Sequence, residues 1–294
     1  MKHLVKQSLR HVSPRLLDTI SAFRADRRNQ DAMRRNGSMD IARRLVARHG
    51  AQVLGGPFAG MTYLSSSIGS AYLPKLIGSY ECELHPVIER ALANGYDTVV
   101  DVGCAEGYYA VGLARRLDRA ARIHAFDLYP AARRQCRLMA RLNAVDDRVR
   151  VGGFCDTVRL NAVLGERPGR PLRTLVVCDC EGYERDLLRP DAAPGLVTSD
   201  LIIEMHDFLD PSISGAIVER FRDTHAVTVI RAREREPHDF PVLSFLSPEE
   251  QKLALWEMRP PAMEWAFLTA RVWESATGSA LNGDGRANNA RNAP

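Results

Sequence analysis

The chain has 294 residues, of which 45% are hydrophobic and 26% are charged. These shares favour one large α/β domain with attached segments and argue against bulk disorder. No apolar run approaches the roughly 18 residues that a membrane-spanning helix needs. The N-terminus lacks the apolar region of a secretory signal, and the six cysteines do not have the spacing of a disulfide framework. We therefore expect a cytoplasmic protein without a transmembrane segment.

Positive charge is concentrated in residues 1–50, which carry 12 Lys or Arg against 4 Asp, whereas the whole chain has a net charge of only +4. Apolar residues recur there at helical intervals, first from Leu4 to Phe23 and again from Met39 to Val46. We interpret residues 1–50 as a basic helical extension that packs on the main domain or, in a homodimer, on a second subunit. Binding of lipid headgroups, nucleic acid or an acidic substrate is the alternative to a merely solvated arginine-rich face.

Residues 51–96 join this extension to the first strand. They contain glycines, prolines and aromatic residues without a regular period, followed by a predicted helix from Glu83 to Asn94. We expect this segment to form part of an active-site lid, with Tyr63, Lys75 and Tyr80 as candidate contacts to a substrate, or else to be a packed linker.

The stretch from Thr98 to Asp127 has the pattern of one βαβ unit. An apolar β-branched run leads into a turn with glycines at 103 and 107, and a helix-period segment is followed by a second apolar run that ends at Asp127. In parallel sheets built from such units, the ligand lies at the carboxyl ends of the strands, near the glycine turn.

The residues of this turn favour a cation over a phosphate. The third glycine of the dinucleotide fingerprint is absent, and Asp101 and Glu106 would repel a phosphate. Gly103 and Gly107 would let the backbone approach a small polar group, and Asp127 could accept hydrogen bonds from ribose hydroxyls. S-adenosylmethionine, a nucleoside with a positive charge and an amino-acid tail, meets these requirements.

Three segments resemble known motifs. Asp101-Val-Gly-Cys-Ala-Glu-Gly107 resembles the first motif of class I S-adenosylmethionine-dependent methyltransferases, and Val177-Cys-Asp-Cys-Glu-Gly-Tyr-Glu184 and Asp200-Leu-Ile-Ile-Glu-Met-His206 resemble motifs of the FkbM-type group of these enzymes. The resemblance covers about residues 97–232, and a weaker similarity extends from Glu264 to Arg271. Another nucleotide-binding doubly wound domain is the alternative.

The resemblance also implies roles for individual residues. Asp156, which follows the third predicted strand, would meet the adenine amino group, although a helix N-cap is a competing role for it. The cofactor site implied in this way contains Asp101, Gly103, Cys104, Gly107, Asp127 and Asp156.

The rest of the chain completes the predicted sheet. After a helix from Pro130 to about Leu142, strands are expected at 148–154, 174–179, 201–206, 226–231 and 264–271. The resemblance implies a doubly wound, seven-stranded Rossmann-like sheet with the order 3-2-1-4-5-7-6 and an antiparallel last strand. This methyltransferase domain would span residues 97–274, with an insert at 232–263 that contains a capping box and a helix from Pro248 to Glu257, and residues 275–294 would form a disordered tail.

Acidic residues and one histidine follow the fourth and fifth predicted strands. Glu204 and His206 would point the same way, since side chains on a strand alternate with period two. In the favoured mechanism, His206 is a general base, oriented by Glu204 or Asp179, that removes the proton of an acceptor hydroxyl. In the less favoured alternative, Asp179, Glu204 and His206 bind a divalent metal that lowers the pKa of that hydroxyl. Of Glu181 and Glu184, one is expected only to cap a helix that begins at Gly182.

The resemblance implies O-methylation of a small-molecule hydroxyl acceptor, such as a sugar or other glycan, a glycolipid or a polyketide-like product. An RNA methyltransferase that uses the basic extension is an alternative, but nucleic acid is not the expected partner, because the Asn-Pro-Pro-Tyr type of element found in base-modifying enzymes is absent. A non-catalytic subunit that binds S-adenosylmethionine is a third hypothesis, which the clustering of carboxylates with His206 at the strand ends disfavours.

Overall fold

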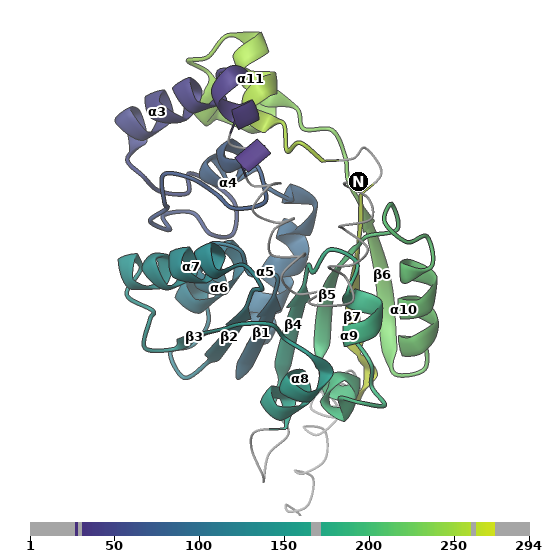
Figure 1. Cartoon of the computed structure of the whole chain (residues 1–294). Helices are drawn as coiled ribbons and strands as arrows, with labels where there is room; N and C mark the ends of the chain where they lie inside the picture. The colour runs from purple at the N-terminus through teal and green to yellow at the C-terminus, as the bar shows by residue number, and fades with distance from the viewer. Residues whose placement is uncertain (1–26, 29–30, 166–171, 260–262, 274–294) are drawn as a thin grey trace, which may run out of the picture.

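A computed structural model describes residues 27–28, 31–165, 172–259 and 263–273. These residues form a seven-stranded sheet with the order β3-β2-β1-β4-β5-β7-β6, covered by helices (Figure 1). The strands are β1 (Thr98–Val102), β2 (Arg122–Phe126), β3 (Val149–Gly152), β4 (Thr174–Cys178), β5 (Asp200–Met205), β6 (His225–Arg231) and β7 (Glu264–Ala270). The predicted fold class and strand order are confirmed.

Six of the strands run in the same direction, and five of these pair with one another in parallel. β1 pairs in parallel with both β2 and β4, and parallel pairing continues to β3 on one side and to β5 on the other. β7 runs antiparallel to β5 and to β6, as predicted for the last strand. The carboxyl ends of β1, β2, β4 and β5 therefore meet at one edge of the sheet, where parallel α/β sheets bind their ligands.

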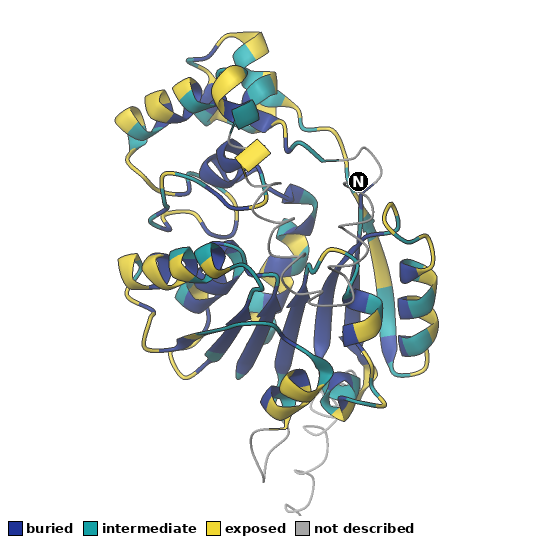
Figure 2. Cartoon of the chain, viewed as in Figure 1, coloured by how far each residue is buried: buried dark blue, intermediate teal, exposed yellow. Residues whose placement is uncertain are grey.

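Helices cover both faces of the sheet (Figure 2). The apolar residues of α5, α6 and α7 pack with Val99 of β1 in one core, and those of α8, α9 and α10 pack with Val100 in a second core. Neighbouring residues of β1 serve different cores because successive side chains of a strand point to opposite faces. The helices are α5 (His85–Asn94), α6 (Tyr108–Arg116), α7 (Pro130–Leu142), α8 (Thr157–Leu164), α9 (Glu184–Leu187) and α10 (Ile213–Phe221).

Three further helices lie together at one end of the molecule, beyond the sheet (Figure 1): α3 (Ser38–His49), α4 (Tyr72–Ile77) and α11 (Pro248–Leu255). The predicted capping box at the start of α11 is confirmed, because Ser247 and Glu250 exchange hydrogen bonds between side chain and backbone. Arg44 of α3 forms an ion pair with Glu250, and the guanidinium of Arg48 lies 4.8 Å from the ring centroid of Phe245. The second predicted helix of the extension thus packs on the insert of its own chain.

Some predicted boundaries differ from the structure. The expected helix from Glu83 begins as a 3-10 helix, Cys82–Leu84, before α5, and the helix expected to reach Glu257 ends at Leu255. Further 3-10 helices are Pro194–Thr198, Pro237–Asp239 and Pro241–Leu243. The first predicted helix of the extension, up to Phe23, and the predicted tail at 275–294 lie outside the described residues. Among the described helices, none has the length and apolar character needed to cross a membrane.

Candidate functional site

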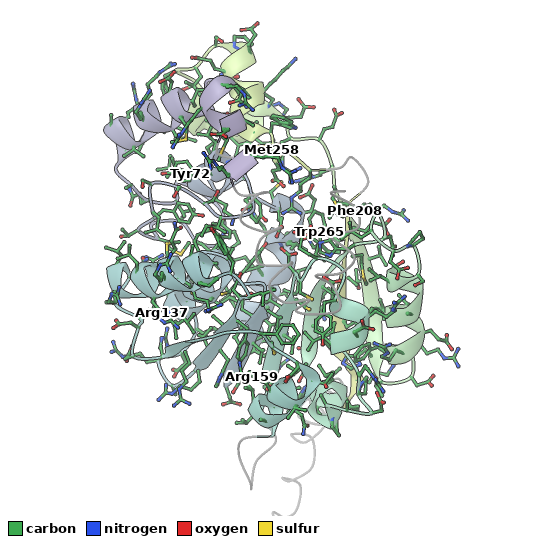
Figure 3. The ribbon with its side chains drawn as sticks, viewed as in Figure 1. Tyr72, Arg137, Arg159, Phe208, Met258 and Trp265 are labelled. Atoms are coloured by element: carbon green, nitrogen blue, oxygen red, sulfur yellow. The ribbon has the colours of Figure 1, made fainter. Side chains whose placement is uncertain are left out.

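A cavity of about 1280 Å³ lies at the carboxyl ends of β1, β2, β4 and β5. The segment before β1 and the insert after β6 complete its wall, and Figure 3 labels Phe208 and Met258, which line it from the segment after β5 and from the insert. The wall consists of Arg28, Ile68, Gly69, Ser70, Lys75, Tyr80, Asp101, Val102, Gly103, Cys104, Ala105, Tyr108, Tyr109, Phe126, Asp127, Leu128, Tyr129, Phe154, Cys155, Val177, Asp179, Cys180, Glu181, Tyr183, Glu204, His206, Phe208, Leu209, Glu257, Met258, Arg259 and Met263.

Strained backbone is concentrated around this cavity. Among the described residues, five that are not glycine have a positive φ, and three of them, Ala105, Glu181 and Met258, line the cavity. A fourth, Glu81, contacts Arg259 of the cavity wall. Such conformations cost on the order of 1–3 kcal/mol each and gather at functional sites, where the surrounding structure holds them.

The two glycines of the β1–α6 turn are required by the protein's own packing. Gly103 has φ 90°, and a Cβ there would lie 1.6 Å from the carbonyl oxygen of Asp179. Gly107 has φ 97°, and a Cβ there would lie 2.9 Å from Sγ of Cys136. Only Gly103 of the pair belongs to the described cavity wall, so the approach of a ligand to Gly107 stays a prediction. Cys104 is buried and lines the cavity.

Asp101 lines the cavity and has one buried carboxylate oxygen without a partner in the described part of the chain. The residue is buried, and its Oδ2 has no hydrogen-bond partner among the described residues. Burial raises the pKa of Asp101 to about 7, and hydrogen bonding to the backbone of Ala110 opposes that rise. A buried polar atom without a partner costs free energy, so this oxygen is suited to a ligand that brings a positive charge or a hydrogen-bond donor.

Asp127 lies directly after β2, as predicted, and lines the same cavity. Its Oδ2 accepts a hydrogen bond from the backbone N–H of Ala105 at 2.9 Å, and its Oδ1 accepts one from that of Tyr129 at 2.6 Å. Burial raises the pKa of Asp127 to about 6. Each carboxylate oxygen can accept a second hydrogen bond, so the two backbone contacts fix the carboxylate and leave it able to bind hydroxyl groups.

Glu106 does not face the ligand cavity, so the expectation that it would repel a phosphate there is wrong. Its fully buried carboxylate accepts hydrogen bonds from the Tyr63 hydroxyl at 2.5 Å, the Lys75 ammonium at 2.6 Å and the Ile68 backbone N–H at 2.8 Å. These three donors belong to the segment before β1. Glu106 therefore clamps that segment over the glycine turn, and Tyr63 and Lys75, two of the candidate substrate contacts, serve this clamp.

Replacing Glu106 with glutamine should destabilise the fold. The change keeps a side-chain oxygen but leaves the ammonium of Lys75, whose side chain is only 4% exposed, without a countercharge. Breaking a buried pair in this way costs about 3–5 kcal/mol, which chemical denaturation would measure. The control is Glu89→Gln, since the Glu89–Arg116 pair is 50% and 40% exposed and is worth less than about 1 kcal/mol. Equal losses in the two variants would contradict the clamp.

Asp156 begins α8 as its N-cap, where its side chain accepts a hydrogen bond from the backbone N–H of Arg159 at 2.9 Å. The helix-capping role is therefore confirmed. The neighbouring residues Phe154 and Cys155 line the cavity, whereas Asp156 is not part of its described wall.

His206, directly after β5, lines the cavity with a carboxylate near each nitrogen of its ring. The residue is buried; its Nδ1 lies 2.9 Å from Oε1 of Glu184, and its Nε2 lies 3.5 Å from Oδ1 of Asp179. The contact with Glu184 is an ion pair and not an aligned hydrogen bond, since Nδ1 has no hydrogen-bond partner among the described residues. Burial alone would lower the pKa of His206, but Glu184 and Asp179 outweigh it and raise the pKa to about 9.

Asp179 and Glu184 hold the two sides of this imidazole. Burial raises the pKa of Asp179 to about 6, against the opposing effect of His206. Glu184 is fully buried and also accepts a hydrogen bond from the backbone N–H of Cys180 at 2.9 Å. The prediction that Asp179 lies beside His206 agrees with the structure, but Glu184, which contacts the imidazole more closely, was interpreted from the sequence only as a possible helix cap.

Glu204 does not orient His206, contrary to one of the predicted arrangements. Its carboxylate instead forms an ion pair with the guanidinium of Arg259. Burial, reinforced by Asp179, raises the pKa of Glu204 well above its usual range. Arg259 comes from the insert, so this pair closes the cavity wall between β5 and the insert.

Arg259 is a residue that sequence reasoning did not identify. Besides Glu204, it pairs with Glu81 and, through Nε, with Oε2 of Glu257 at 3.0 Å, and its guanidinium lies 4.8 Å from the ring centroid of Tyr80. Glu81 and Glu204 are distant in sequence from Arg259, and no local motif relates them. Tyr80 lines the cavity as predicted, and its hydroxyl accepts a hydrogen bond from Arg259.

A candidate metal site differs from the one predicted. Ligand atoms of Asp179, Glu181 and His206 all lie within 4.8 Å of one another, and two carboxylates with an imidazole suit a divalent cation that also keeps water ligands. Glu204 does not belong to this group, because Arg259 neutralises it. The predicted set of Asp179, Glu204 and His206 is therefore corrected to one that contains Glu181.

No family model matches the chain, and no curated protein matches it either. Solved structures with a similar fold include an O-methyltransferase from Bacillus cereus in complex with SAH (14% identity, TM-score 0.41, 62% of this chain and 78% of that chain). The O-methyltransferase TomG from Streptomyces achromogenes, in complex with SAM, has 14% identity and a TM-score of 0.41 over 62% of this chain and 77% of its own. A precorrin-6y C5,15-methyltransferase from Geobacter metallireducens has 11% identity and a TM-score of 0.42, with 63% and 88% covered. The likeness is distant in all three.

Proposed function

We propose that the protein is an S-adenosylmethionine-dependent methyltransferase that methylates a hydroxyl group of a small-molecule acceptor. The observation that carries this proposal is the unpaired, buried Oδ2 of Asp101, a residue of the cavity wall that Asp127 also lines. Both carboxylates are fixed at the carboxyl ends of adjacent parallel strands, where a nucleoside is expected to bind.

The charge of the wall favours a cationic nucleoside over a nucleotide. Of the three lysine and arginine residues of the described wall, Lys75 and Arg259 are paired with carboxylates, and Arg28 comes from the N-terminal segment. Beside Asp101 and Asp127 a phosphate would meet two carboxylates, whereas the ammonium and sulfonium of S-adenosylmethionine would be attracted. When bound, this cofactor supplies an activated methyl group, so the protein must mainly position the acceptor and remove its proton.

The residues at the ends of β4 and β5 can remove that proton. Nε2 of His206 faces the cavity near Asp179, while Glu184 holds Nδ1 on the buried side. The negative charge of Glu184, 2.9 Å from Nδ1, favours the ring proton on that nitrogen, which leaves Nε2 to accept a proton from a hydroxyl once His206 is neutral. We infer that His206 is the general base and that Glu184 and Asp179 are its positioning residues.

A divalent metal is the second candidate mechanism, favoured by the grouping of Asp179, Glu181 and His206. These residues would hold the ion, which would lower the pKa of the acceptor hydroxyl. His206 could not then be the base, because the nitrogen that faces the acceptor would bind the metal. Removal of metal with EDTA separates the two mechanisms. The general-base mechanism predicts unchanged methyl transfer after EDTA treatment and dialysis, whereas loss of activity with EDTA and its recovery with Mg²⁺ or Mn²⁺ would establish the metal.

The test of the proposed activity is incubation of the purified protein with methyl-labelled S-adenosylmethionine and fractionated cell extract. Label is expected in a fraction of small molecules that carry hydroxyl groups, such as sugars or glycolipids. Label found in RNA alone would favour the alternative acceptor. Tight cofactor binding without label in any fraction would favour the non-catalytic alternative.

A further inference from the structure

We propose that one face of helix α7 is a docking surface for an anionic lipid bilayer. This α7 face consists of Arg134, Arg137, Leu138, Arg141 and Leu142, which are all exposed. Their spacing of three and four residues puts them on one side of the helix. The opposite side is buried against the sheet through Ala132, Cys136, Met139 and Ala140.

Positive charge on the α7 face is not compensated within the protein. The helix sequence, PAARRQCRLMARL, contains four arginines and no acidic residue. In the described part of the chain, Arg134 and Arg141 take part in no ion pair, and Arg137 donates to the backbone oxygens of Arg133 and Val151. By contrast, exposed arginines such as Arg43 and Arg222 pair with carboxylates. An anionic partner would supply the missing countercharge.

The leucines point to lipid as that partner. Leu138 and Leu142 are 41% and 48% exposed and lie beside the arginines, along one flank of the α7 face. At a bilayer surface, leucines can enter the boundary between headgroups and acyl chains while arginine stems extend their guanidinium groups to the phosphates. A surface for single-stranded nucleic acid would instead present aromatic rings on which bases stack, and the α7 face has none.

The position of α7 connects this surface to the cavity. Asp127, Leu128 and Tyr129 line the cavity, and α7 begins at the next residue, Pro130. Figure 2 shows exposed residues recurring along α7, and Figure 3 labels Arg137 on this helix. A bilayer docked on the α7 face would lie near the cavity rim. If the proposed function holds, this placement suits an acceptor whose hydroxyl is carried by a lipid headgroup.

Vesicle binding by the full chain tests the surface without reference to catalysis. The protein should sediment with vesicles of phosphatidylcholine and phosphatidylglycerol but not with pure phosphatidylcholine, and salt should weaken the binding. The triple variant R134E/R137E/R141E should lower partitioning by more than about 100-fold, since each basic residue contributes about fivefold at an anionic surface. The matched control R90E/R222E/K252E makes the same change in net charge at exposed residues outside α7 and should retain most of the binding.

A second variant distinguishes lipid from nucleic acid. Leu138→Gln with Leu142→Gln keeps helix propensity and should weaken vesicle binding about tenfold while leaving binding of an unstructured RNA unchanged. Circular dichroism and calorimetry with S-adenosylmethionine check that each variant is folded and test the proposed cofactor separately. Equal vesicle binding by the R134E/R137E/R141E variant and its control would overturn the proposal, as would RNA binding that depends on these arginines in a protein that ignores anionic vesicles.

Discussion

Replacing His206 with alanine is expected to lower the rate of methyl transfer by about 10²–10⁴-fold, the usual contribution of a general base. In the proposed mechanism the imidazole removes the acceptor proton, and it lies between Glu184 and Asp179. Binding of S-adenosylmethionine should change little, because Asp101 and Asp127 remain in place. Initial rates with labelled cofactor, together with calorimetry, measure the two effects. His238→Ala is the control, since that side chain is 79% exposed.

The pH dependence gives an independent check of this assignment. Because the pKa of His206 is raised to about 9, the imidazole is mostly protonated at neutral pH and must lose its proton before it can act. The rate should therefore rise with pH and level off above about pH 9. A flat profile between pH 6 and 10, or activity that survives His206→Ala, would remove His206 from the catalytic role.

Asp101→Asn should weaken S-adenosylmethionine binding by about 10–100-fold without destabilising the protein. The substitution removes the charge from an oxygen that has no partner in the cavity wall, and hydrogen bonds to charged groups contribute about 1.5–3 kcal/mol. The fold itself should be as stable as before or slightly more so, because a buried carboxylate is replaced by a neutral group of the same shape. Calorimetry and chemical denaturation measure the two effects.

The same carboxyl group predicts how affinity depends on pH. The pKa of Asp101 is raised to about 7 by burial, so a bound cation favours its charged form, and affinity should fall as the pH is lowered below about 7. The control is Asp147→Asn, because the Asp147 carboxylate is 62% exposed and pairs with Arg119. An Asp101→Asn protein that binds the cofactor as tightly as the unaltered protein would exclude Asp101 from the site.

Features encoded in short stretches of sequence could be predicted. The β-branched run of β1 and the position of Asp127 directly after β2 could be predicted because short apolar runs bounded by turn residues mark the strands. The capping box at Ser247 and Glu250 likewise needs only four consecutive residues. The order of the seven strands followed from resemblance, and the structure confirms it.

Pairings between distant segments could not be predicted in the same way. Glu106 was interpreted as a charge facing the ligand, but donors from 31 to 43 residues earlier in the chain take its carboxylate. Glu204 and His206 are two residues apart, at the end of one strand. Arg259, which is 55 residues from Glu204, binds the Glu204 carboxylate, so Glu204 does not contact His206 as predicted. Such pairs depend on where the segment before β1 and the insert pack against the sheet. The spacing of apolar residues within a segment does not predict that position.

The most direct measurement is calorimetric titration of the full chain with S-adenosylmethionine, S-adenosylhomocysteine, ATP and NADH. The wall around Asp101 and Asp127 predicts saturable heat with the first two compounds, weaker binding of S-adenosylmethionine by Asp101→Asn, and no binding of ATP or NADH. Heat with ATP or NADH but none with S-adenosylmethionine or S-adenosylhomocysteine would contradict a cavity built for a cationic nucleoside.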